Sequence, residues 1–158
     1  MSTTAAARRP VHYETIDDFL ADVDHLAGQK FHTVGHWSFP EILDHLAKTV
    51  TASVDGYGFK APWFARVLIA PFVKNAFITK TMRAGFKLPK SARSLLPEPG
   101  LSLSDAVDRL KRAIERYKRA PNRAPHPFVG ALASQEYDSL HLRHSELHMS
   151  FVVPDETG

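Results

Sequence analysis

The chain has 158 residues, enough for one domain with a sizeable core, and its 44% hydrophobic and 23% charged residues are ordinary for a globular protein. It has no cysteine, which excludes disulfides, thiolate zinc sites and a cysteine nucleophile, so a metal would need His, Asp or Glu ligands. The formal net charge of +3 is unevenly spread, because residues 57–100 contain eight Lys and Arg residues and a single Glu.

The first ten residues carry Arg8-Arg9 without an apolar stretch after them, so they do not form a secretory signal. We expect residues 1–10 to be a disordered lead and residues 11–158 to form a single domain. No apolar run is long enough for a membrane span. We therefore expect a cytoplasmic protein without stable membrane insertion, and we predict no nucleic-acid partner.

Two helices are predicted in the first third of the chain. The first runs from Thr15 to Gly28, with Thr15 and Asp18 in a capping-box pattern and Gly28 as the stop. The second runs from Ser38 to about Asp55, and here Ser38 and Glu41 form the capping box. Its apolar stripe has helical spacing and places His45 in the middle of the buried face.

Two further helices are predicted towards the C-terminus. One starts at Ser102 or Ser104 and runs to about Lys118. The last runs from Ser134 to about Val153, and its inward positions follow a stripe of Tyr137, His141, His144, His148 and Phe151 or Val152. The same helical spacing predicts that Arg143 and Glu146 lie on the solvated outer face of this helix. Four long amphipathic helices predict an all-α four-helix bundle.

A long crossover joins the second and third predicted helices, from about residue 57 to 100. Its apolar part predicts short helices broken at Pro71, and residues 85–100, rich in Gly and Pro, predict irregular structure. The segment is basic and aromatic. It can cap a site for an anionic substrate, shape a pocket, form a dimer contact or touch anionic lipid through residues 60–93.

Three histidines make the strongest chemical signal. His144 and His148 are one helical turn apart, so both imidazoles project from one face of the last helix. A bundle can bring His45 of the second helix opposite them. Three neutral imidazoles around a divalent ion leave a coordination position open for water or substrate, as in catalytic sites. Imidazole also suits several metals, so the residues alone do not select one.

Two motifs of this chain carry a resemblance to a known family. They are Trp37-Ser-Phe-Pro-Glu-Ile-Leu-Asp-His45-Leu and the His144-x-x-x-His148 pair, and over residues 11–153 the chain resembles the DinB/YfiT-like superfamily of metalloenzymes. Residues 126–132 and 140–151 are similar to a branch of it known only as a domain of unknown function. The resemblance implies a DinB-like four-helix bundle, often dimeric, with a nickel- or zinc-type site whose three ligands map to His45, His144 and His148.

Some members of that superfamily are similar to thiol S-transferases that use low-molecular-weight thiols such as bacillithiol or mycothiol. The resemblance therefore implies a divalent-metal enzyme, a small-molecule substrate and a homodimer. His141 departs from the usual pattern, and we interpret it as a catalytic residue in proton transfer, a substrate contact or a fourth ligand. The substrate-binding residues are unknown. The alternative function is a non-catalytic metal-binding or stress-related interaction protein.

Overall fold

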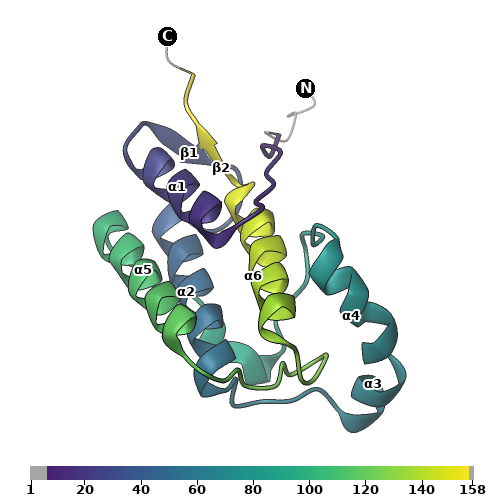
Figure 1. Ribbon diagram of the computed structural model, residues 1–158. Helices are drawn as coiled ribbons and strands as arrows, with labels where there is room; N and C mark the ends of the chain where they lie inside the picture. The colour runs from purple at the N-terminus through teal and green to yellow at the C-terminus, as the bar shows by residue number, and fades with distance from the viewer. Residues whose placement is uncertain (1–6, 157–158) are drawn as a thin grey trace, which may run out of the picture.

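The computed structural model describes residues 7–156 and is all-α apart from one small sheet (Figure 1). In chain order the elements are α1 Ile16–Ala27, β1 Phe31–Thr33, α2 Phe39–Asp55, α3 Trp63–Leu68, α4 Ala70–Thr79, the 3-10 helix η1 Lys90–Leu95, α5 Leu103–Arg119, α6 Ser134–Met149 and β2 Val152–Pro154. The four long helices α1, α2, α5 and α6 stand side by side, and α3 and α4 project from them (Figure 1).

The helix starts follow the local chemistry of the sequence. The hydroxyls of Thr15 and Ser38 accept hydrogen bonds from the third residue of α1 and α2, and both capping boxes are complete. Ser102, the first of the two predicted starts, caps α5. These caps satisfy backbone N–H groups that have no partner inside a helix, which explains why these boundaries were predictable.

One hydrophobic core joins the four long helices. Each contributes one apolar face: Phe19 of α1, Leu46 of α2, Leu110 of α5 and Tyr137 of α6 are all buried within it. A second, smaller cluster holds η1 against α2 through Ala52, Ala92 and Leu95, together with Tyr57. The connection after α2 is therefore fastened to α2 where η1 lies.

The short sheet was not predicted. β1 and β2 pair antiparallel, with His32 opposite Val153, and Val34 N–H donates to the carbonyl of Phe151 at 3.0 Å. The prediction that the last helix reaches Val153 is wrong, because α6 ends at Met149. β-branched residues 152 and 153 favour an extended chain once a partner strand lies beside them, and only the tertiary fold supplies β1 as that partner.

The connection between α2 and α5 contains the short helices that were predicted, but its second half is more regular than predicted. Its apolar part forms two short helices that meet at Ile69, two residues before Pro71. Residues 85–100 are not irregular throughout, because Lys90–Leu95 form η1. Among the described residues no helix is both long and apolar enough to cross a bilayer.

Glu146 and Arg143 do not lie on a solvated face, and that prediction is wrong. Glu146 is 1% exposed, and its carboxylate accepts hydrogen bonds from Tyr13 N–H at 2.9 Å and pairs with Arg143 at 2.7 Å. The N-terminal segment before α1 crosses this face of α6 and covers it. Residues 1–6 of the expected disordered lead lie outside the described residues, and Arg9 within that lead donates to the carbonyl of Val152 at 2.7 Å.

Candidate metal centre

His45 enters the site from the buried face of α2. Its side chain is 2% exposed, and its Nδ1 lies 2.7 Å from the carbonyl oxygen of Leu95. A carbonyl can only accept, so Nδ1 carries the hydrogen and donates it. The neutral ring therefore has an unprotonated Nε2, which is the atom that faces α6. A backbone carbonyl that holds the second nitrogen in this way is a frequent device for orienting a histidine metal ligand.

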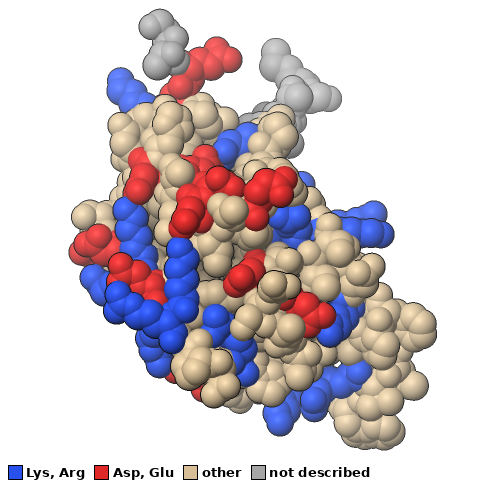
Figure 2. Space-filling view, viewed as in Figure 1, with Lys and Arg blue, Asp and Glu red and all other residues tan. Residues whose placement is uncertain are grey.

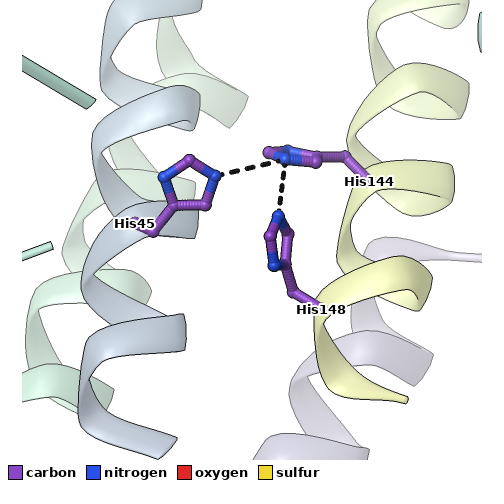
Figure 3. Close-up of side chains that lie close together, drawn as sticks. All are labelled: His45, His144 and His148. Carbon is purple, nitrogen blue, oxygen red and sulfur yellow. Dashed lines mark hydrogen bonds between the residues drawn. The ribbon is translucent and has the colours of Figure 1, made fainter. Parts of the chain in front are cut away.

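His144 and His148 enter from α6 and complete the cluster. Figure 3 shows the three rings converging from α2 and α6 on one point. His144 Nε2 lies 3.3 Å from His45 Nε2 and 3.0 Å from His148 Nε2. The three ligand atoms all lie within 4.8 Å of one another. The predicted set of ligands is therefore brought together in space.

These separations suit a metal better than hydrogen bonding. His144 Nε2 carries at most one hydrogen, so it can donate to only one of the two ring nitrogens beside it. Around a tetrahedral zinc ion with bonds of 2.0–2.1 Å, ligand nitrogens lie about 3.4 Å apart. The observed distances of 3.3 and 3.0 Å approach that value. At most one of the two Nε2–Nε2 contacts can therefore be a hydrogen bond, whereas a shared cation accounts for both.

The environment keeps these imidazoles neutral. Burial lowers the pKa of His148 to about 3, with a further contribution from the nearby His45. Burial, followed by the repulsion of His148 and His45, places the pKa of His144 well below its usual value. Burial also lowers the pKa of His45, although the hydrogen bond to Leu95 opposes this shift. Only neutral imidazole binds a metal, so the cluster is in its ligating form at neutral pH.

Trp37 forms one wall of the cluster. Its ring stacks on His148 with centroids 5.4 Å apart and an interplanar angle of 20°, and it also contacts His45 at 4.9 Å. Trp37 lies just before the start of α2. It is partly buried and borders the cavity described next, so it both packs against the ligands and faces open space.

A cavity of about 1280 Å³ opens beside the three histidines. This exceeds the volume of about 300–1,000 Å³ usual for ligand pockets. Its walls come from α2, α3, α4, α6 and the segments at 34–37, 57–61, 80–88 and 126–128, together with Ile69, Leu95 and Phe151. The aromatic residues of its lining are Trp37, Tyr57, Phe59, Phe77, Phe86, Phe128 and Phe151. Two cations, Lys80 and Arg83, also border it.

His141 lies one turn before His144 but outside the three-histidine cluster. Its Nε2 lies 3.0 Å from the hydroxyl of Ser53, and its ring packs between Tyr117 and Tyr137. Burial lowers the pKa of His141 to about 3. Such a ring is neutral and a weak base at neutral pH, which disfavours a role as general base. His141 also lines the cavity, where it can contact a bound molecule.

His126 was missed as a cavity residue. It lies in the turn before α6, where Nδ1 accepts hydrogen bonds from the N–H groups of Phe128 and Val129 at 3.2 and 3.4 Å. Its other nitrogen must then carry the hydrogen, and burial lowers its pKa to about 4. The sequence signal was weak, because His-Pro-Phe in a turn has no periodic spacing that would point to a site.

The model of one family, described as "Protein of unknown function (DUF1569)", matches residues 5–155. The chain belongs to this family. The match includes all three histidines of the cluster and both helices that hold them. No curated protein and no solved structure matches the chain.

Proposed function

We propose that this protein is a metal-dependent enzyme of the DinB type, in which His45, His144 and His148 hold a divalent ion, zinc or nickel. The observation that carries the proposal is the convergence of three imidazole Nε2 atoms at the edge of a large apolar cavity. Three protein ligands beside open space leave a coordination position for a substrate, whereas a structural site closes all four. The family would then be a branch of the DinB/YfiT-like superfamily with its four-helix bundle.

The chemistry that fits best is transfer of a low-molecular-weight thiol to a small electrophile. A divalent ion held here would supply charge that stabilises the attacking sulfur as a thiolate. The chain has no cysteine, so the thiol must come from a second substrate. The apolar cavity walls suit a hydrophobic electrophile, and the cationic border suits a thiol that carries carboxylates.

In this proposal the chain's own residues hold the metal ligands in position and exclude water from the site. His45 is held in one tautomer by Leu95, and Trp37 restricts the rotation of His148 by stacking on it. The aromatic walls keep water away from the reacting sulfur. His141, neutral and bonded to Ser53, is proposed as a contact for the bound electrophile.

The first test is the metal content of protein purified without a histidine tag. We expect close to one zinc or nickel ion per chain in the wild type and none in the His144→Ala, His148→Ala double variant. His25→Ala, which removes an exposed histidine of α1, is the control and keeps the metal. Circular dichroism of all three proteins establishes that the helices remain.

The second test measures turnover with bacillithiol or mycothiol and a chlorodinitrobenzene as electrophile. Activity in the metal-loaded wild type, absent from the double variant, supports the enzyme. Metal binding without turnover for a panel of thiols and electrophiles favours the alternative, a non-catalytic metal-binding protein. A chain that takes up no metal even after exposure to zinc and nickel rules out the enzyme and the metal-binding protein, and it favours the stress-related interaction protein.

A further inference from the structure

Helices α3 and α4 form an elbow that projects from the rest of the molecule (Figure 1). No residue of α3 is buried, and Ala70 is the one buried residue of α4. α4 packs along α6, whereas the main neighbour of α3 is α4 itself. The outer side of the elbow is thus without a partner among the described residues.

The outer side of the elbow is strongly apolar. Phe72 is 83% exposed and Trp63 is 73% exposed. We call this surface the apolar elbow, and its residues are Trp63, Phe64, Val67, Leu68 and Phe72. Soluble proteins rarely leave so many large adjoining side chains in water unless the surface binds something.

Positive charge borders the apolar elbow on its inner side. The sequence has no Asp or Glu between Asp55 and Glu98, and within that stretch lie eight Lys and Arg residues. Figure 2 shows blue side chains along the inner border of the tan elbow at the lower right. Lys74 is paired with Glu136. Among the ion pairs of residues 7–156, none involves Lys60, Arg66, Lys80, Arg83, Lys87 or Lys90.

We propose that the apolar elbow docks this protein on an anionic lipid surface. Trp and Phe side chains partition well into the interfacial layer of a bilayer, and flanking Lys and Arg side chains reach anionic headgroups. A second copy of the chain fits less well, because a two-fold contact through this surface would bring two basic borders together. The docking is peripheral, and it does not depend on the metal centre or its chemistry.

The geometry fixes which side of α4 would face the bilayer and which side faces the cavity. Phe72 on α4 points outward, while Val73, Ala76 and Phe77 of the same helix line the cavity. A bilayer that contacts the elbow therefore meets the back of the helix that forms one cavity wall. Lys80, Arg83 and Phe86 continue from the end of α4 along the cavity border.

The chain offers a built-in probe, because its only two tryptophans are Trp37 and Trp63. In Trp37→Phe, all tryptophan fluorescence comes from Trp63 in the elbow. Vesicles of phosphatidylcholine with phosphatidylglycerol should shift this emission to the blue and should co-sediment the protein. Vesicles of phosphatidylcholine alone should do neither, and high salt should weaken the effect because it screens the headgroup attraction.

Leu68→Glu with Phe72→Glu, made in the same background, tests the surface. Both side chains are exposed, so the fold should survive, and partitioning should fall about tenfold or more. Leu96→Glu is the matched control, since Leu96 is exposed but lies outside the elbow, and it should partition nearly as Trp37→Phe does.

Three results would overturn the proposal. The first is absence of binding to anionic vesicles at low salt. The second is self-association in sedimentation velocity that Leu68→Glu, Phe72→Glu abolishes, without vesicle binding, which would make the elbow a contact between copies. The third is binding of a single-stranded oligonucleotide through these residues in preference to vesicles, which would assign the basic border to nucleic acid.

Discussion

His45 Nδ1 donates a hydrogen bond to the carbonyl oxygen of Leu95 at 2.7 Å, so a residue of the long connection orients a side chain of α2. Leu95 is 6% exposed and packs with Ala92 and Tyr57 in the small cluster beside α2. The connection therefore contributes to the proposed metal centre without supplying a ligand. The position of that carbonyl depends on how firmly Leu95 is buried.

Leu95→Ala should weaken metal binding without removing a ligand. Loss of the buried side chain loosens η1, and the carbonyl that holds His45 loses its fixed position. Changes to residues that orient a metal ligand commonly cost about 10–100-fold in affinity. We expect a loss of about tenfold for zinc, measured by competition with a chromophoric chelator. Leu96→Ala, at the exposed neighbour, should keep wild-type affinity, and equal losses in the two variants would contradict the role given to Leu95.

Trp37 should report metal binding directly. In Trp63→Phe it is the single tryptophan, and its ring stacks on His148 at 5.4 Å. Imidazole binds copper and nickel as well as zinc, and paramagnetic Cu²⁺ quenches a fluorophore at such a distance. We expect stoichiometric quenching by Cu²⁺ that is lost in Trp63→Phe, His148→Ala. Quenching that persists in the second protein would place the ion elsewhere.

Glu146→Gln should destabilise the fold although it keeps the shape of the side chain. The change removes the charge opposite Arg143, whose side chain is only 13% exposed. Breaking one partner of a buried ion pair typically costs about 3 kcal/mol. Urea denaturation should show a loss of this size in the free energy of unfolding. Glu14→Gln is the control, because His12 lies 3.1 Å from both Glu14 and Glu146 but Glu14 is exposed, and this variant should remain close to wild type.

Stability should fall as the pH drops below about 6.5. Burial lowers the pKa of His141 to about 3, so the folded state binds this proton less readily than the unfolded state. The contribution of the neutral ring is complete above the unfolded pKa and is lost as the pH falls towards the folded one. For one such group the loss between pH 7 and pH 5 is about 2 kcal/mol.

His141→Asn should reduce that pH dependence. The difference in unfolding free energy between pH 7 and pH 5, measured by urea denaturation, should shrink by about 2 kcal/mol relative to wild type. The absolute stability is not the readout, because the variant also loses packing against Tyr117 and Tyr137. His25→Asn, at an exposed position, should leave the difference unchanged. An unchanged difference in His141→Asn would show that the buried ring is not protonated on unfolding.

Local chemistry made most of the helices predictable. The capping residues Thr15, Ser38 and Ser102 satisfy helix N–H groups from within a few residues of chain, so their effect does not depend on distant contacts. The stripe that includes Tyr137 and His141 faces the core as its spacing predicts. The end of α6 was not predictable in this way, because β2 needs β1 from a distant part of the chain.

The prediction that Glu146 lies on the solvated face of α6 was wrong for a related reason. Helical spacing identifies an apolar stripe, but it does not show that an extended segment crosses a polar face. Tyr13 covers Glu146 from 133 positions away in the sequence. A glutamate that is buried against Tyr13 and Arg143 looks the same in sequence as one in water.

The sequence by itself determined that the protein is helical, that no thiolate ligand is available, and that His144 and His148 share a helix face, since these follow from composition and from a repeat of 3.6 residues. Only the tertiary structure decided that His45 meets that pair, that Leu95 sets its tautomer, that His141 turns instead to Ser53, and that a large cavity opens beside the cluster. Such relationships join residues dozens of positions apart, and packing of the whole core settles them because no local rule acts over that distance.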